Sequence, residues 1–156
     1  MNGNPFCSEI NIVGDGIVGI FDSPKKYQLD RVFSSAAKIS SLIDVLNCKY
    51  DHADIEKITV GIGLSYGRAL MIKSGAKGSG INDVVWMGEV VNEATKLSIY
   101  GNSTYSDKEM MVSKIVYQNL NEHNQNLLSY NSNRGCYHGY VINTEMNDWY
   151  KDNCVE

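Results

Sequence analysis

The chain has little proline and no long hydrophobic run, and each absence excludes a class of protein. Only 2 of its 156 residues are proline, and no long polar run interrupts it, which argues against a disordered chain. No apolar stretch approaches the roughly 18 to 20 residues that a membrane helix needs. Residues 1–9 resemble neither a secretory signal nor a transit peptide. We therefore expect a cytoplasmic protein with no membrane contact.

The chain also lacks the residue clusters of disulfide frameworks, zinc sites and nucleic-acid surfaces. Its 4 cysteines lie far apart without a C-x-x-C pair, and its 3 histidines are not spaced as metal ligands. Such spacing favours isolated reduced thiols. The net charge is -4 and the lysines and arginines are scattered, so nonspecific nucleic-acid binding is not expected. The cysteines predicted to be reduced are Cys7, Cys48, Cys136 and Cys154.

Hydrophobic periodicity predicts one domain, residues 1–156, of the α+β class with a mainly antiparallel sheet and helices packed on it. Two β-branched runs flank Gly14, Asp15 and Gly16, which is typical of a hairpin with a tight turn. The expected order is two strands, a helix, three strands, a helix, a strand, a helix and two strands, at residues 10–13, 17–21, 22–47, 58–64, 69–72, 83–87, 89–100, 110–112, 113–120, 127–130 and 137–142.

Two segments place polar groups where chemistry is possible. Asp15 lies at the tip of the predicted hairpin, and Asn92 and Lys96 lie four residues apart on the predicted helix 89–100, where they share a face. Considered alone, Asp15 is more often a turn residue and the pair more often a solvated helix face. The glycine-rich residues 73–80 match neither a P-loop nor a dinucleotide-binding loop, so they predict a flexible connection between strands.

Three segments, taken in order, resemble the class III nucleotidyl cyclases. In that family a hairpin aspartate follows glycine, a glycine-containing strand comes next, and a G-x-x-V-N-x-A segment opens a helix. Residues 11–21, 60–67 and 87–94 have these features in this order. The resemblance implies the α+β fold of class III cyclases, with a ferredoxin-like core, and it favours functional roles for Asp15 and Asn92.

Within this family the chain resembles the pyrimidine nucleotide cyclases of the Pycsar antiphage systems. The resembling stretches are residues 66–73, 78–88 and 136–139, with residues 21–24 as a further match. The resemblance implies conversion of UTP or CTP to cUMP or cCMP with release of pyrophosphate. The cyclic nucleotide is then sensed by a separate effector. Of the two substrates we expect UTP.

The resemblance also implies roles for single residues at the reacting centre. Asp15 matches the second of two aspartates that bind two Mg²⁺ or Mn²⁺ ions, and Asn92 matches the asparagine that orients the ribose. Lys96 falls where purine cyclases carry an arginine that stabilises the transition state. Arg68 and Arg134 are the alternative candidates for a catalytic cation, and Arg134 is also a candidate substrate ligand that could bind phosphate.

Two further positions concern the base. Asn11 stands where adenylyl cyclases have Lys and guanylyl cyclases have Glu, and Val85 stands where they have Asp, Thr or Cys. The pair that reads a purine is therefore absent, as a pyrimidine substrate would require. A degenerate pseudoenzyme would show the same change. The alternatives are an inactive cyclase-like dimerisation or nucleotide-binding module, and a divergent adenylyl cyclase.

The resemblance has two consequences for assembly. In the family the metal carboxylates come from one subunit and the asparagine helix from the other, which implies a homodimer with two composite sites. A class III cyclase begins with a strand bearing the first metal aspartate, whereas the hairpin aspartate of this chain is already Asp15. We therefore expect a domain that is incomplete at its N-terminus, either a truncated form of a longer enzyme or a natural remnant with too few carboxylates to hold two cations.

Overall fold

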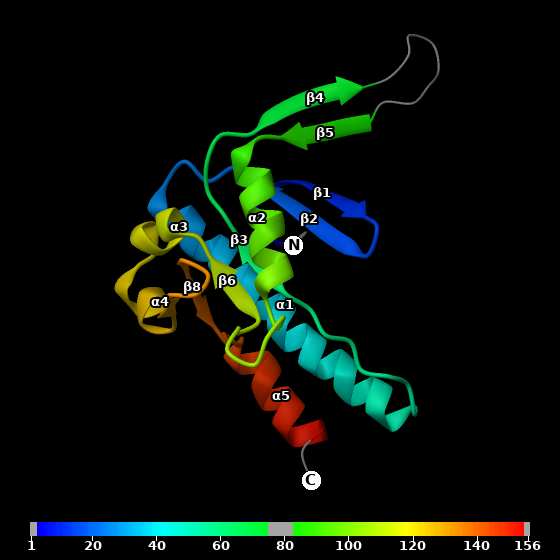
Figure 1. Cartoon of the computed structure of the whole chain (residues 1–156). Coiled ribbons are helices and arrows are strands. Elements are labelled where there is room, and N and C mark those ends of the chain that lie inside the picture. The colour runs from blue at the N-terminus through cyan, green and yellow to red at the C-terminus, as the bar shows by residue number, and fades with distance from the viewer. Residues whose placement is uncertain (1–2, 75–82, 155–156) are drawn as a thin grey trace.

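The computed structural model of the chain describes residues 3–74 and 83–154 (Figure 1). Most of the predicted glycine-rich loop at residues 73–80 lies outside the described residues. No described helix is both long enough and apolar enough to cross a membrane. The elements are β1 (Cys7–Val13), β2 (Gly16–Phe21), α1 (Lys26–His52), β3 (Ile62–Leu64), β4 (Leu70–Ser74), β5 (Asp83–Met87), α2 (Glu89–Tyr100), β6 (Met110–Val112), α3 (Lys114–Asn119), α4 (Glu122–Asn126), β7 (Ser129–Asn131), β8 (Cys136–Gly139) and α5 (Thr144–Cys154).

The strands of the described residues form three separate sheets. β1 pairs with β2, β4 pairs with β5, and a four-stranded sheet has the order β3-β6-β8-β7. β3 and β6 are parallel, and the other pairs are antiparallel. The α+β class and the mainly antiparallel pairing are thus confirmed, although the strands do not join into one sheet.

β6 is the centre of the core. Met110, Met111 and Val112 are each 0% exposed. Because successive side chains of a strand point to opposite faces, Met110 and Val112 pack with α1 and α3, whereas Met111 packs with Leu97 of α2. The four-stranded sheet is therefore covered by α1 on one face and by α2 on the other, as Figure 1 shows.

α1 is longer and starts later than the predicted helix at 22–47. Its N-cap is Lys25, whose backbone N–H donates to the side chain of Gln28, a contact that closes the first turn after Pro24. The helix continues to His52, where two basic side chains favour its C-terminal end. Its buried face is formed by Leu29, Val32, Phe33, Ala36 and Ala37.

The predicted strand at residues 58–64 is wrong over its first half. The Asn47 side chain accepts from the Ile58 N–H at 2.8 Å and donates to the Ile58 carbonyl at 2.9 Å. Both backbone groups of Ile58 are therefore satisfied by a helix side chain instead of a neighbouring strand. Regular pairing begins only at Ile62.

Two short helices were not predicted. α4 begins after Asn121, whose side chain accepts from the Asn124 N–H at 2.9 Å. α5 begins after Asn143, whose side chain accepts from the Met146 N–H at 3.1 Å. Asparagine is a favourable N-cap residue, so these two caps were the signal available in the sequence. The predicted cap at Ser113 is confirmed, because its hydroxyl accepts from the Val116 N–H.

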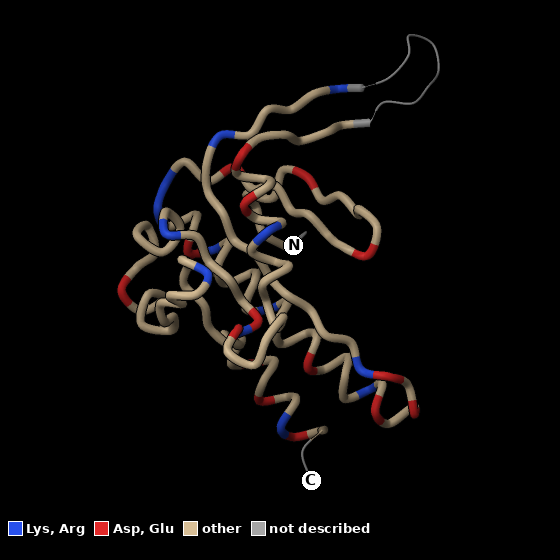
Figure 2. Tube along the Cα trace, in the orientation of Figure 1, with Lys and Arg blue, Asp and Glu red and all other residues tan. Residues whose placement is uncertain are grey.

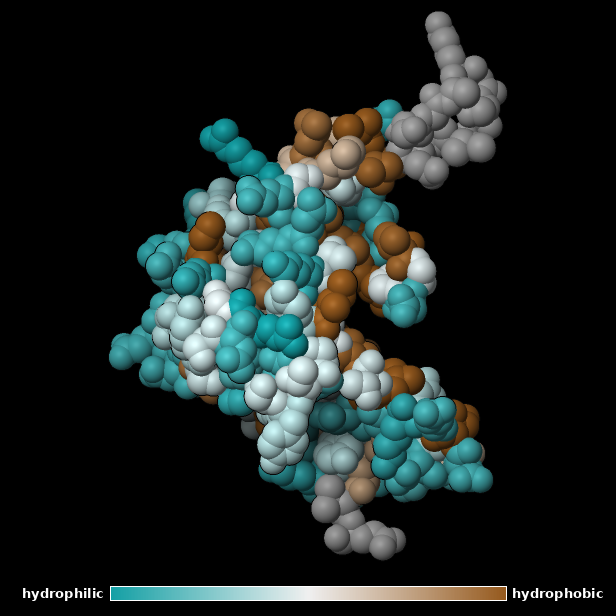
Figure 3. Space-filling view, viewed as in Figure 1, coloured by the Kyte–Doolittle hydropathy of each residue, from teal (hydrophilic) through white to brown (hydrophobic). Residues whose placement is uncertain are grey.

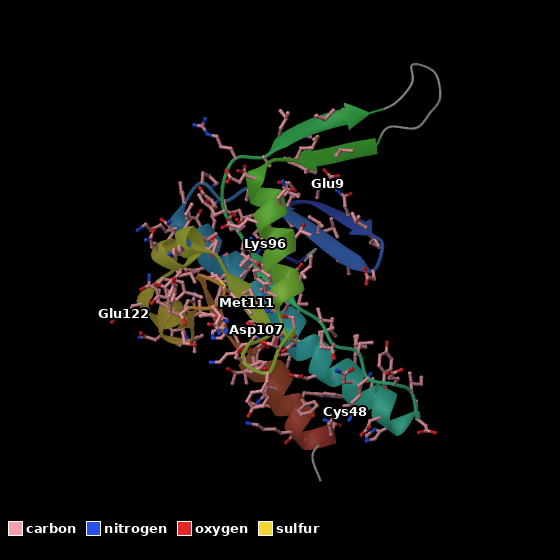
Figure 4. All side chains as sticks on the ribbon, in the orientation of Figure 1. Glu9, Cys48, Lys96, Asp107, Met111 and Glu122 are labelled. Carbon is pink, nitrogen blue, oxygen red and sulfur yellow. A yellow bond between two sulfur atoms is a disulfide. The ribbon has the colours of Figure 1, made fainter. Side chains whose placement is uncertain are left out.

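The prediction of four reduced thiols is wrong for two of them. Cys48 of α1 and Cys154 of α5 form a disulfide across 106 residues of sequence. Their spacing alone could not reveal this pair, because a disulfide requires two Cα atoms to approach in the folded chain. Cys7 and Cys136 are free. α5 contributes no buried residue, and the disulfide attaches this helix covalently to α1 (Figure 4).

We predict that reduction of the disulfide loosens α5 and leaves the central sheet intact. Amide hydrogens of residues 144–154 should exchange faster in the Cys48→Ser variant or in a dithiol reductant, whereas those of β6 and β8 should keep their protection. Hydrogen exchange with mass spectrometry measures both regions in one sample. The Cys7→Ser variant is the matched control, and equal protection of α5 in both variants would contradict the prediction.

Candidate functional site

α2 carries two of the predicted site residues, and its position is set by Gly88. This glycine has φ 137°, a conformation that other residues rarely adopt. Its carbonyl accepts from the N–H groups of Val91 at 3.1 Å and Asn92 at 3.2 Å. A Cβ atom on Gly88 would come within 3.1 Å of the Arg68 carbonyl oxygen. The Gly88 turn therefore places Asn92 in the first turn of α2. The backbone of Arg68 lies beside Gly88.

Asn92 and Lys96 are exposed side chains one helical turn apart on α2. Leu97 of the same helix is buried at 5% exposure against Met111. Since the inner side of α2 is anchored in the core, an amide and an ammonium group project together to solvent. On this side of α2, the Asn92 amide can form a hydrogen bond with a nucleotide, and the Lys96 ammonium can pair with a phosphate.

α2 packs unusually close to β3 because small residues face it. A Cβ atom on Gly63 would collide with the backbone of Ala94 and Ser98, and one on Gly61 would collide with Ser98 and Gly101. The glycines of the segment before and within β3 therefore have a packing role. The distance between α2 and the sheet, and with it the position of Asn92, depends on them.

We predict that Gly63→Ala displaces α2 and destabilises the protein by roughly 1 to 3 kcal/mol, as overpacking of a tight contact does. Urea denaturation measures the loss of unfolding free energy. Gly3→Ala is the control, since no atom lies within 4 Å of a Cβ placed there. A Gly63→Ala protein as stable as the control would show that α2 can move outward freely.

Two of the predicted cations meet at the ring of Tyr100. The Lys96 Nζ lies 5.7 Å from the ring centroid, and the Arg134 Cζ lies 4.2 Å from it. Arg134 is also paired with Asp107, at 2.7 Å between Nη2 and Oδ2. Arg134 is thus engaged within the fold, whereas Lys96 and Arg68 are exposed cations.

Asp107 is a buried carboxylate that accepts hydrogen bonds from several side chains. Its side chain is 1% exposed. The hydrogen bonds from Arg134 are the main reason that the pKa of Asp107 lies far below its ordinary value, and burial opposes them. This group ties the segment between α2 and β6 to the turn before β8. The other donors to Asp107 are Ser103, Thr104 and Asn131.

We predict that Asp107→Asn lowers the free energy of unfolding at pH 7 by about 2 kcal/mol, because charged hydrogen bonds are lost and Arg134 loses its partner. A lowered carboxyl pKa stabilises the fold above the unfolded value of about 3.9. The difference between variant and wild type should therefore shrink as the pH falls below about 4. Denaturation at pH 7 and pH 3 tests this, with Asp152→Asn on exposed α5 as control; a constant difference would contradict it.

A hollow in the described surface lies away from the predicted site. It has a volume of about 260 Å³ and lies between α1 and the segment before β3. Glu109 in its wall is 8% exposed, and burial raises the pKa of this carboxyl. The Ser40 hydroxyl donates a hydrogen bond to this carboxylate at 2.6 Å. None of the predicted site residues lines this hollow.

Asp15 lies at the tip of the β1–β2 hairpin, where Gly14 at φ 62° makes the predicted tight turn. The carboxylate is exposed, and the hairpin projects from the body in Figure 1. Among the described residues, no group of three or more His, Cys, Asp and Glu side chains could hold a metal ion. The described part of one chain therefore does not by itself fit the two-ion site that the resemblance implies, and Asp15 remains a single candidate ligand.

Asn11 and Val85, the two predicted base-reading positions, are not equivalent in the structure. The Nδ2 of Asn11 donates to Glu9 Oε1 at 3.0 Å, and the Nε1 of Trp86 donates to Glu9 Oε2 at 2.7 Å. Trp86 of β5 is thus on the side of Asn11, whereas the neighbouring Val85 alternates to the other face and is 43% exposed. Sequence reasoning missed Glu9 and Trp86, because no local pattern shows that β1 and β5 meet.

The surface near these strands is apolar, and the charges are dispersed. Figure 3 shows hydrophobic atoms over the β4–β5 hairpin and beside the β1–β2 hairpin. In Figure 2, lysines, arginines and acidic residues are scattered along the trace. The exposed apolar residues of the two hairpins are Ile12, Val13, Ile17, Leu70, Met71, Ile72, Val85 and Met87.

No protein-family model and no solved structure matches the chain, but two curated proteins do. The chain is similar to two uridylate cyclases. That of Treponema porcinum is 40% identical over 145 residues, which cover 90% of this chain and 50% of the relative. That of Gulbenkiania mobilis is 37% identical over 126 residues, which cover 75% of this chain and 47% of the relative. The chain therefore spans about half the length of the uridylate cyclases it matches.

Proposed function

We propose that this chain belongs to a uridylate cyclase, which converts UTP to cUMP and pyrophosphate. The observation that carries the proposal is the similarity to two uridylate cyclases, one of them over 90% of this chain. Of the two pyrimidine substrates that the sequence left open, the names of these relatives favour UTP. The class III fold with a ferredoxin-like core, and a role in cytoplasmic antiphage defence with a separate effector, are parts of the same proposal.

In the proposed reaction the ribose 3′-oxygen attacks the α-phosphorus, the bond to the departing pyrophosphate breaks, and the 3′-hydroxyl proton passes to solvent or pyrophosphate. Asn92 orients the ribose, and Lys96 or Arg68 stabilises the negative charge on the transferring phosphate. The support for this assignment is that Asn92 and Lys96 project together from α2 and that the Arg68 backbone lies beside Gly88.

We further propose that the active form is a homodimer in which Asp15 of one copy faces α2 of the other. Both parts are exposed, and apolar residues surround the two hairpins. A second copy would bring additional carboxylates to the site. Two Mg²⁺ or Mn²⁺ ions would supply charge stabilisation of the phosphates when bound, with Asp15 as the ligand from this chain.

One observation favours a second candidate, a nucleotide-binding module without turnover. Within the described residues, no three metal-ligating side chains gather. Such a module would bind UTP through α2 and release it unchanged. A divergent adenylyl cyclase, the third possibility, would convert ATP instead.

We predict that the chain converts radiolabelled UTP to cUMP with Mn²⁺, and that Asn92→Ala lowers the rate about 100-fold, as misplacement of a reactant does. Product analysis across the four nucleoside triphosphates distinguishes the candidates. Binding without product would favour the module, and cAMP as main product would favour the adenylyl cyclase. Glu122→Gln on exposed α4 is the matched control and should keep the wild-type rate.

We also predict that two inactive variants restore activity when mixed. In an equal mixture of Asp15→Ala and Asn92→Ala proteins, half of the dimers are mixed and each holds one intact site, so about a quarter of the wild-type rate should return. Each variant alone should stay inactive. Absence of any recovery, with mixed dimers present, would show that the site is not shared between copies.

A further inference from the structure

The β1–β2 and β4–β5 hairpins are joined by the carboxylate of Glu9, which Figure 4 places between them. Each of its two oxygens accepts one hydrogen bond. Trp86 Nε1 donates to Oε2 at 2.7 Å, and Asn11 Nδ2 donates to Oε1 at 3.0 Å. Glu9 and Asn11 are two residues apart on β1, so their side chains lie on the same face. The three residues form one continuous hydrogen-bonded row from β5 to β1.

The donor and acceptor roles in this row are fixed. The indole N–H of Trp86 can only donate, and an ionised carboxylate can only accept. Glu9 therefore binds the NH₂ end of the Asn11 amide, and Oδ1 points away from it. If the amide turned over, Oδ1 would lie against a carboxylate oxygen and both would be acceptors. The carboxylate thus holds the Asn11 amide in one of its two orientations.

The orientation of an amide matters for reading a pyrimidine. Uracil presents an N3–H donor beside its O4 acceptor, whereas cytosine presents an N3 acceptor beside its 4-amino donor. The two bases therefore have opposite polarity along the same edge. A freely rotating amide can match either base, since it offers one donor and one acceptor in both orders. An amide that is held in one orientation matches only one of them.

We propose that Glu9 is a positioning residue that fixes the Asn11 amide and thereby makes the nucleotide site select uracil over cytosine. The fixed amide offers Oδ1 to uracil N3–H and its second Nδ2 hydrogen to the neighbouring ring carbonyl. Trp86 acts on Asn11 only through Glu9, because its indole N–H donates to the second oxygen of Glu9. The inference rests on the proposed function, with Asn11 at the base-reading position that the resemblance to class III cyclases implies.

The decisive variant is Glu9→Gln, which keeps the size of the side chain. Its single oxygen accepts from Trp86 Nε1, which leaves the terminal NH₂ to donate to Asn11 Oδ1, so the Asn11 amide turns over. The ratio of kcat/KM for UTP to that for CTP should fall about tenfold, the scale on which one bidentate base contact discriminates. Trp86→Phe keeps an aromatic side chain but removes the N–H donor, so it should lower the ratio by a smaller factor. Glu122→Gln, far from Glu9 in Figure 4, should leave the ratio unchanged.

A purely structural role of Glu9 would lower the rates with UTP and CTP equally. If the UTP-to-CTP ratio of kcat/KM stayed unchanged in both Glu9→Gln and Trp86→Phe, the inference would be overturned, but the proposed function would stand. Thermal melts of each variant identify loss of folding. If Glu9→Gln does not fold, Trp86→Phe provides the comparison with the wild type. Calorimetric binding of UTP and CTP makes the test independent of turnover. A chain that binds UTP more tightly than CTP without producing cUMP, and loses this preference in Glu9→Gln, would contradict the proposed function and support the inference. Binding without base preference in the wild type, or no nucleotide binding, would overturn the inference.

Discussion

The structure depends on the complete burial of β6. Its three residues are fully buried, and the strand pairs with β3 on one edge and with β8 on the other. Because both faces are covered, β6 needs apolar side chains at every position, and the run of two methionines and a valine provides them. α1 and α2 pack on opposite faces of this one strand. The position of α2, and of the exposed amide and ammonium groups it carries, is therefore set from the core outward.

The pair between the buried Asp107 and the half-buried Arg134 adds a polar constraint to this apolar centre. A charge taken out of water is tolerated only where partners compensate for the lost hydration, and Asp107 has charged and neutral donors around it. Arg134 also lies over Tyr100 at the end of α2. The ion pair therefore connects the last turn of α2 with the turn before β8. It also engages the guanidinium of Arg134, which the sequence analysis named as a candidate phosphate ligand.

The two hairpins have a different physical character from this centre. Each is a two-stranded sheet, and many of their apolar side chains are exposed. Isolated hairpins are only marginally stable in water, so contacts between hairpins count for more than they would in a large sheet. Glu9 supplies such a contact through Trp86. The proposed base contact thus lies where the framework is held by a few directional hydrogen bonds.

The sequence by itself determined most elements and the order in which they follow. β5, α2 and β6 have the predicted bounds, because their periodicity and flanking residues act over a few neighbours. The placement of Asn92 and Lys96 on one side of α2 was predictable for the same reason. Only the tertiary structure decided which distant groups meet. The Cys48–Cys154 disulfide, the capture of Arg134 by Asp107 and the contact between Glu9 and Trp86 each join segments far apart in the chain. No local pattern encodes such contacts, since they arise from the way in which whole elements pack against one another.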